Sequence, residues 1–177
     1  MTVEIRAWIQ DCEKTLKKLD NFGFTSKGSY KFKDLIYHPK NGNYDLNREF
    51  MRLRLYEKSN WDYLPRGSVT LVHKVKPNPQ ITGQILQKYD FSHFSEAEDF
   101  LYSTHRYAFS ASRTGTEYKS DGLRIFVEDI EFLKPSVEVI AETKKQVLSF
   151  LHRLGHLGIT SDSVPQLIAI AQHKHDQ

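Results

Sequence analysis

Apolar and polar side chains alternate in several short segments of this chain, and this period of two is the pattern of a half-buried β-strand. Within residues 50–56, three apolar side chains share one face, while Arg52 and Arg54 share the opposite face. A strand with one apolar face has to cover that face. The alternation therefore restricts the chain to a sheet or barrel whose strands pack against helices or against each other.

The same alternation, interrupted by turn-forming residues, predicts eight strands: residues 2–9, 30–38, 50–56, 68–76, 84–91, 107–118, 123–131 and 136–140. Capping residues predict four helices, which begin near Asp11, at Ser95 with Glu98, at Thr143 with Gln146, and at Ser163 with Gln166. The predicted fold class is α+β, an eight-stranded antiparallel β-barrel with its helices packed outside and a duplicated strand–helix–strands plan. No linker-like stretch divides the chain, so residues 1–177 are expected to form a single domain.

In a simple sandwich, each strand has one apolar face and one polar, solvated face. In this chain the faces opposite the apolar ones are charged. They carry Glu4, Arg6, Arg52, Arg54, Lys74, Lys76 and Glu138. If the helices cover the apolar faces, these side chains line the barrel interior. Unpaired buried charges are costly, so that interior would be wet and would hold a counter-anion such as a polyphosphate. The alternative is that the charged faces lie in solvent on the outside of ordinary amphipathic strands.

The bulk composition fits a globular domain and names no partner. The chain has 25 Lys and Arg against 22 Asp and Glu, and this net charge of +3 is too small to predict nucleic-acid binding. Cys12 is the only cysteine, which is consistent with a reducing compartment. The chain has neither the apolar run of a signal peptide nor the ~20 apolar residues of a membrane span. We therefore expect a cytoplasmic protein that binds neither nucleic acid nor membranes, and a homodimer is left open.

Several segments, in order along almost the whole chain, resemble the CYTH or triphosphate tunnel family. That family includes class IV adenylyl cyclases and thiamine triphosphatases. Its opening Glu-x-Glu-x-Lys strand resembles residues 2–6 (TVEIR), and its Leu-Arg-x-Arg strand resembles residues 51–54 (MRLR). Its Leu-Thr-x-Lys strand resembles residues 71–74 (LVHK), and its late Lys-x-Arg strand resembles residues 111–113 (ASR). The acidic strands that close the family's domain are similar to residues 123–140.

The resemblance implies a tunnel in which basic residues hold a triphosphate and acidic residues hold a metal ion. Carried over by position, the phosphate-binding residues would be Arg6, Arg52, Arg54, Lys74 and Arg113, with Lys76 as a weaker candidate. The resemblance also implies Mg²⁺ or Mn²⁺ bound by Glu4, Asp129 and Glu138. One ion is expected, because Thr2 and Ile140 stand where the family has two further glutamates.

Three functions remain open for such a tunnel, and no catalytic residue is predicted. The first hypothesis is a divalent-metal-dependent hydrolase of a small-molecule triphosphate, such as a nucleotide, thiamine triphosphate or tripolyphosphate. The others are a class IV adenylyl cyclase that makes cyclic AMP from ATP and a catalytically weakened triphosphate or polyphosphate binding protein. A barrel that binds only other proteins is a further alternative. Trp61, Tyr63 and Pro65 lie in a predicted loop and could contact a base or ring, but a surface anchor or loop packing explains them equally well.

Overall fold

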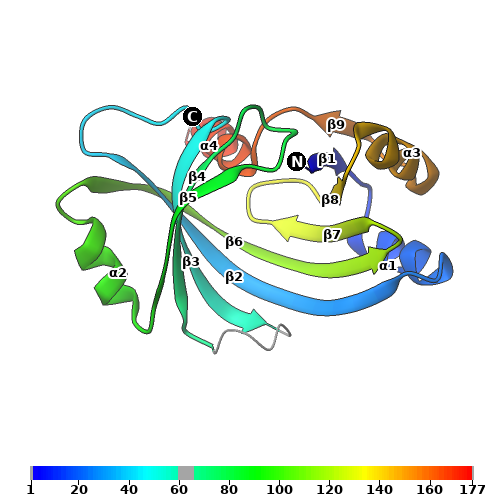
Figure 1. The fold of residues 1–177 in the computed structure, drawn as a ribbon, viewed down its shortest axis with the longest axis horizontal. Helices are drawn as coiled ribbons and strands as arrows, with labels where there is room; N and C mark the ends of the chain where they lie inside the picture. Colours follow the sequence, from blue (N-terminus) through cyan, green and yellow to red (C-terminus); the bar gives the residue numbers. More distant parts are fainter. Residues whose placement is uncertain (1, 60–65, 177) are drawn as a thin grey trace.

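The computed structural model of this protein describes residues 2–59 and 66–176. Along the chain its elements are β1 (Val3–Trp8), α1 (Cys12–Asn21), β2 (Thr25–Pro39), β3 (Glu49–Ser59), β4 (Val69–Val75), β5 (Gln84–Phe91), α2 (Phe94–Leu101), β6 (His105–Ser120), β7 (Leu123–Ile130), β8 (Ser136–Ala141), α3 (Lys144–Leu154), β9 (Gly158–Thr160) and α4 (Val164–His175) (Figure 1). A strand, a helix and three strands therefore occur twice in succession, which confirms the predicted duplicated plan.

The strands form one antiparallel sheet in the order β5-β4-β3-β2-β6-β7-β8-β1-β9. The eight predicted strands are all present, and β9 is a short ninth strand that pairs with β1. The α+β class and the tunnel-like curvature of the sheet agree with the prediction (Figure 1). Strand pairing does not close this sheet into a complete barrel, because the hydrogen-bonded order ends at β5 and β9.

The connection between β4 and β5 lies beside β1, near the opening between the two ends of the sheet. The Glu4 backbone N–H donates to the carbonyl of Gln80 at 2.9 Å, and the Thr82 N–H donates to the carbonyl of Thr2 at 3.1 Å. The start of β1 thus contacts this connection, while its later residues pair with β9. The connection after β4 and strand β9 therefore share one edge of β1. Together they bring the two ends of the sheet near each other without forming a continuous ladder of hydrogen bonds.

Side-chain caps set three of the four helix starts as predicted. Asp11 accepts a bond from the Lys14 N–H, and Ser163 accepts one from the Gln166 N–H. Thr143 and its partner three residues on form both bonds of a capping box. The predicted cap at Ser95 is wrong, because α2 begins one residue earlier and its N-cap, His93, makes no side-chain cap bond. None of the helices within the described ranges is long and apolar enough to cross a membrane.

Three helices cover the apolar outer face of the sheet, as predicted. Helices α1 and α3 lie over β1, β7 and β8, where Ile5, Ile125 and Val139 belong to the largest buried cluster. Helix α2 lies on the other flank, where Leu101 packs with Leu71 of β4 (Figure 1). Each methylene removed from water there contributes about 0.8 kcal/mol. Because the helices bury the apolar outer faces of these strands, the charged faces of the same strands point inward.

Helix α4 departs from the prediction that all helices pack outside. Its Val164 and Ile168 pack with Ala111 and Ile130, which lie on the inner face of β6 and β7. Nearby, Ile36 and Phe50 continue this apolar region on β2 and β3, and α4 residues line the same cavity as both of them. The inner face is apolar at this end, so it binds a helix instead of water. The charged part of the interior lies beyond it.

Candidate functional site

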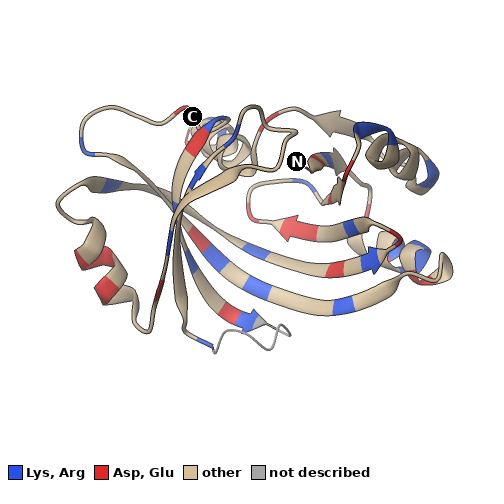
Figure 2. Ribbon diagram, viewed as in Figure 1, with Lys and Arg blue, Asp and Glu red and all other residues tan. Residues whose placement is uncertain are grey.

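A cavity of about 350 Å³ lies inside the curved sheet. All six cationic residues predicted to bind phosphate line it, and so do Glu4 and Glu138. Figure 2 shows Lys, Arg, Asp and Glu positions at intervals along the strands of the curved sheet. They come from β1, β3, β4, β6 and β8 and from the residue just after β4. The inward turn of the charged faces is therefore present. Of the described residues that line the cavity, seven are Lys or Arg and five are Asp or Glu, a formal excess of two positive charges.

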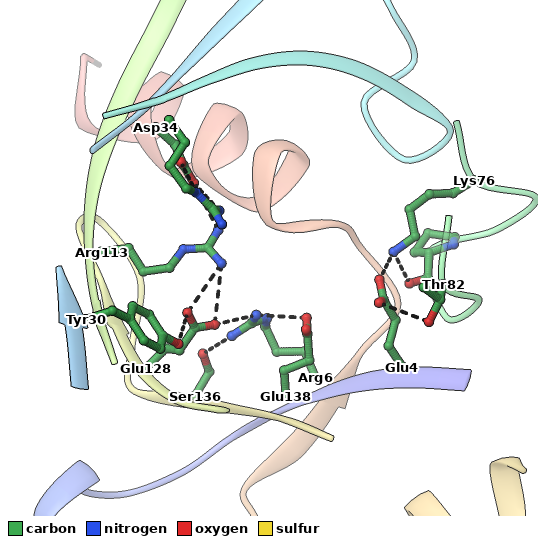
Figure 3. A network of polar contacts seen from close by, with 12 residues as sticks. Glu4, Arg6, Tyr30, Asp34, Lys76, Thr82, Arg113, Glu128, Ser136 and Glu138 are labelled. Carbon is green, nitrogen blue, oxygen red and sulfur yellow. Dashed lines mark hydrogen bonds and ion pairs between the residues drawn. The ribbon is translucent and has the colours of Figure 1, made fainter. Parts of the chain in front are cut away.

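Arg6 of β1 is the centre of a buried ion-pair network (Figure 3). Its Nη2 donates to Glu128 Oε1 at 2.8 Å and to Glu138 Oε2 at 2.9 Å, and its Nη1 donates to Ser136 Oγ at 2.8 Å. Arg6 is 5% exposed and Glu128 is 2% exposed, so little solvent screens the pair. We call Arg6, Glu128 and Glu138 the paired wall of the cavity. The positive charge of Arg6 is already balanced by the chain itself.

Glu128 was not predicted, although it holds the network together. Its Oε2 accepts the Tyr30 hydroxyl at 2.7 Å, and Arg113 Nη1 lies 3.3 Å from the same oxygen. Burial by itself would raise the pKa of Glu128, but Arg113 and Arg6 outweigh burial and hold that pKa at about 2. Burial and Glu128 raise the pKa of Tyr30, so its phenol remains a hydrogen-bond donor.

A glycine on the neighbouring strand lets Tyr30 reach Glu128. Gly115 of β6 pairs with Tyr30 of β2, and a Cβ at this glycine would overlap the Tyr30 hydroxyl and ring. The Tyr30 ring also stacks on Phe32 with centroids 5.0 Å apart. The absence of a side chain at Gly115 therefore fixes the position of the phenol.

Asp34 is a second buried acid that sequence reasoning missed. Arg54 binds it with two hydrogen bonds, Nε to Oδ1 at 2.7 Å and Nη2 to Oδ2 at 2.9 Å. Arg113 Nη2 lies 3.4 Å from Asp34 Oδ2. Burial by itself would raise the pKa of Asp34, but Arg54, Arg52 and Arg113 together outweigh burial and hold that pKa well below its usual range. Arg54, whose guanidinium also lies 3.7 Å from the centroid of the Phe32 ring, is thus largely neutralised.

Glu4 and Lys76 form a separate pair on the other side of the cavity (Figure 3). Lys76 Nζ donates to Glu4 Oε1 and, at 3.0 Å, to the Pro79 carbonyl, while the Thr82 hydroxyl lies 3.3 Å from Glu4 Oε2. Burial and then the nearby Glu138 raise the pKa of Glu4, although Lys76 opposes them. Lys76 is therefore not a free cation either.

Arg52 and Lys74 differ from the other four cations, because no ion-pair partner for them lies within the described residues. The Arg52 Nε is buried without a hydrogen-bond partner in that part of the chain. Burial and then Arg54 lower the pKa of Arg52 to about 10, and burial lowers the pKa of Lys74. The two are diagonal neighbours on the inner face, since Phe50 pairs with Lys74 and Arg52 pairs with Val72. We call Arg52 and Lys74 the cationic wall.

Only two of the three predicted metal ligands lie in the cavity. Glu4 and Glu138 line the cavity, but Asp129 is exposed and outside it. Successive residues of a strand point to opposite faces, and Asp129 shares the outer face of Ile125 and Val127 while Glu128 points inward. The described residues contain no group of three or more acidic, His or Cys side chains that could hold a metal ion. The carboxylates that are present are paired with cations of the chain, so these residues do not fit the implied metal centre.

The predicted loop residues Trp61, Tyr63 and Pro65, for which contact with a base or ring was one of two interpretations, lie outside the described residues. The cavity instead has described aromatic side chains of its own, among them Phe32, Phe50 and Phe126.

No family model and no curated protein matches the chain by sequence. Several solved structures match its fold. The PH1819 protein from Pyrococcus horikoshii has a TM-score of 0.79 at 16% identity, covering 96% of this chain and 98% of that one. A Vibrio parahaemolyticus protein described as a candidate adenylate cyclase has a TM-score of 0.69 at 10% identity, covering 95% and 97%.

The third structure is HpAC1 from Hippeastrum, described as a candidate adenylyl cyclase with a dominant triphosphatase activity. It has a TM-score of 0.61 at 15% identity and covers 98% of this chain and 96% of its own. At such identities the likeness establishes the fold alone. The chain thus has the tunnel-like α+β fold of structures described as candidate adenylate cyclases, one of them with triphosphatase activity, in agreement with the CYTH resemblance of its sequence.

Proposed function

We propose that this protein binds the phosphate chain of a small-molecule triphosphate, such as a nucleotide, thiamine triphosphate or tripolyphosphate, inside the tunnel. One observation carries the proposal: Arg52 and Lys74 face the cavity without a counter-ion in the described structure, and the Arg52 Nε is an orphaned donor. A buried cation without a partner destabilises a fold. An anion between the two side chains would remove that cost and supply the missing hydrogen-bond acceptors.

The remaining groups suit a chain of phosphates better than a single one. Arg54 and Arg113 lie near the cationic wall but are engaged by Asp34. Phosphate oxygens could take their remaining N–H donors, because a guanidinium has five in a planar fork. Charge-assisted hydrogen bonds contribute about 1.5–3 kcal/mol each. A few such bonds support micromolar affinity after ordering costs.

Thermal unfolding with tripolyphosphate, and with orthophosphate and sulfate as controls, tests this proposal. At a tripolyphosphate concentration of about 100 Kd, binding adds about 2.7 kcal/mol, or roughly 5–10 °C of Tm for a chain of this size. Arg52→Ala and Lys74→Ala should lose most of this shift. Lys58→Ala is the matched control, because Lys58 is an exposed cation on the same strand as Arg52. An unchanged Tm with every polyphosphate, or an equal loss in Lys58→Ala, would contradict the proposal.

A second candidate function is hydrolysis of the bound triphosphate, which the description of the Hippeastrum structure favours. Phosphoryl transfer depends mainly on positioning and charge stabilisation, and inward-facing guanidinium groups can supply both. Release of orthophosphate from tripolyphosphate, ATP or thiamine triphosphate, with and without Mg²⁺ or Mn²⁺, measures it. Pyrophosphate with cyclic AMP from ATP would identify the cyclase reaction instead. Binding without any of these products leaves a pure binding protein.

A further inference from the structure

We propose that the cavity binds its polyphosphate without a divalent metal ion, because Arg6 occupies the carboxylates that a metal would need. This inference rests on the proposed function and concerns how the same site balances charge. It replaces the expectation of one Mg²⁺ or Mn²⁺ ion. Three observations support it, namely the partners of each carboxylate, the register of the strands and the cost of exchanging the partners.

Most carboxylate oxygens of the glutamates in the cavity already have a hydrogen-bond partner. Both oxygens of Glu128 are engaged, one by Arg6 and the other by Tyr30 and Arg113. Both oxygens of Glu4 are engaged, by Lys76 and Thr82. Of Glu4, Glu128 and Glu138, only Glu138 keeps an oxygen to which no described residue donates a hydrogen bond, since its Oε2 alone accepts from Arg6. A metal ion would find one available carboxylate oxygen in this group.

The strand register places no carboxylate directly opposite another on the β1–β8 pair. On the inner face of the β1–β8 pair, Glu4 lies opposite Ile140 and Arg6 lies opposite Glu138. An acid therefore faces an aliphatic side chain in one row and a cation in the next. Directly opposite residues have Cβ atoms only ~4.5–5.5 Å apart, so Ile140 fills the place where a second carboxylate would complete a metal site beside Glu4. At the adjoining position on β7, Asp129 points outward.

Replacing Arg6 by a metal ion as the partner of Glu128 and Glu138 would cost free energy. Mg²⁺ requires near-octahedral oxygen ligation and gives up its waters reluctantly. To use Glu128 and Glu138 it would have to displace the Arg6 guanidinium, which is 5% exposed and has no other acid within ion-pair distance in the described chain. A buried charge that loses its partner is strongly destabilising. Arg6 therefore serves as the built-in cation of the paired wall.

A polyphosphate faces no such conflict, because the cationic wall needs an anion and the one cation of the paired wall, Arg6, is already bound by carboxylates of the chain. The ligand is then the free polyanion, and Mg²⁺ in solution competes by binding the ligand. Calorimetric titration with tripolyphosphate in EDTA and in excess Mg²⁺ or Mn²⁺ tests this directly. We expect binding in EDTA, and equal or weaker binding with either metal. Binding only in the presence of a metal would overturn the inference, whereas no binding in any condition would overturn the proposed function.

Two variants sharpen the test. Glu138→Gln removes one negative charge from a side chain that is 24% exposed, so the fold should tolerate it. Without a metal role, this change should tighten tripolyphosphate binding in EDTA several-fold, because a competing anion is gone. A metal ligand would behave in the opposite way, and weaker binding would count against the inference. Glu142→Gln is the matched control, since Glu142 is exposed just after β8, and it should leave the affinity unchanged.

Arg6→Ala is the complementary variant, because it releases Glu128 and Glu138 together. We expect this variant to gain Mn²⁺ binding that wild type lacks, measured by the loss of the free Mn²⁺ electron paramagnetic resonance signal. Wild-type protein that binds Mn²⁺ as well as Arg6→Ala would contradict the inference. If Arg6→Ala does not fold, the titrations of wild type and Glu138→Gln still decide.

Discussion

The two walls of the cavity use the same type of side chain in opposite ways. On the paired wall, Arg6 is held by two carboxylates and a serine hydroxyl. On the cationic wall, Arg52 has no acid within ion-pair distance among the described residues, and burial with Arg54 lowers its pKa to about 10. The first arrangement makes a fold rigid. The second leaves a buried positive charge without a counter-ion, and a bound anion can balance it.

The contrast shows that a count of cations does not define a binding site. Arg52 and Arg54 are two residues apart on β3 and both line the cavity, yet Asp34 neutralises only Arg54 by a two-bond contact. Stability and ligand binding are therefore expected to separate between neighbouring arginines. Substitutions of the two buried members of the paired wall, Arg6 and Glu128, should lower stability, and substitutions on the cationic wall should abolish binding with little loss of stability.

The largest expected effect is at Glu128. Glu128→Gln leaves Arg6 and Arg113 each without one carboxylate in a buried setting, and breaking such a pair costs about 3–5 kcal/mol. Urea unfolding should show this loss in the midpoint. Asp129→Asn is the matched control, because this adjacent acid is exposed and outside the cavity, and its effect should stay within about 0.5 kcal/mol. Equal effects of the two changes would contradict the assignment of Glu128 as the inward acid.

Gly115→Ala should have the next largest effect. The new methyl group would overlap the Tyr30 ring and move its hydroxyl away from Glu128. Overpacking of this kind costs about 1–3 kcal/mol, measurable by the same unfolding method. Adding Tyr30→Phe separates the steric from the polar part. If Gly115→Ala costs the same in the Tyr30→Phe background, the hydrogen bond to Glu128 contributes nothing to the loss.

A pH dependence should follow from the paired wall. The pKa of Glu128 is about 2 in the folded protein against 4.5 as its ordinary value, so its stabilisation is present above pH 4.5 and is lost as pH falls toward 2. Between pH 7 and pH 3.5 this amounts to about 1.4 kcal/mol. Unfolding curves of wild type and Glu128→Gln should approach each other by that amount at the lower pH. A difference that stays constant would show that Glu128 is not held ionised by its partners.

The smallest expected change is a gain in stability. Arg52→Met replaces a partly buried cation that has no counter-ion with an apolar side chain of similar length. We expect the free protein to become more stable by about 1 kcal/mol, together with loss of the tripolyphosphate-induced Tm shift. Arg54→Met should instead destabilise the protein, because it removes the main ion-pair partner of the buried Asp34 carboxylate. A loss of stability in Arg52→Met as large as that in Arg54→Met would erase the distinction between the two arginines.

Local patterns in the sequence were sufficient to predict most of the fold and the inward direction of the cationic side chains that line the cavity. Alternation on β3 and β4 placed Arg52, Arg54 and Lys74 on one face, and the structure puts all three on the cavity lining. Capping motifs at Asp11, Thr143 and Ser163 were also correct. These features depend on neighbours a few residues away, which a sequence displays directly.

The acidic part of the site could not be predicted as well, because it depends on strand phase and on contacts between distant strands. Alternation from Ile125 and Val127 places Asp129 outward, a signal that the family resemblance overrode. Asp34 lies between inward apolar residues, Phe32 and Ile36, so its segment looks like ordinary core. The open edges of the sheet and the inward position of α4 are set by long-range geometry, for which the sequence offers no local pattern.

The position of tripolyphosphate in a crystal structure of the complex, grown in EDTA, tests the central claim most directly. Phosphate oxygens should lie inside the tunnel within about 2.7–3.2 Å of nitrogen atoms of Arg52 and Lys74, with Arg6 still bound to Glu128 and Glu138. Phosphate bound only to the outer surface, or inside the tunnel but away from both Arg52 and Lys74, would contradict it.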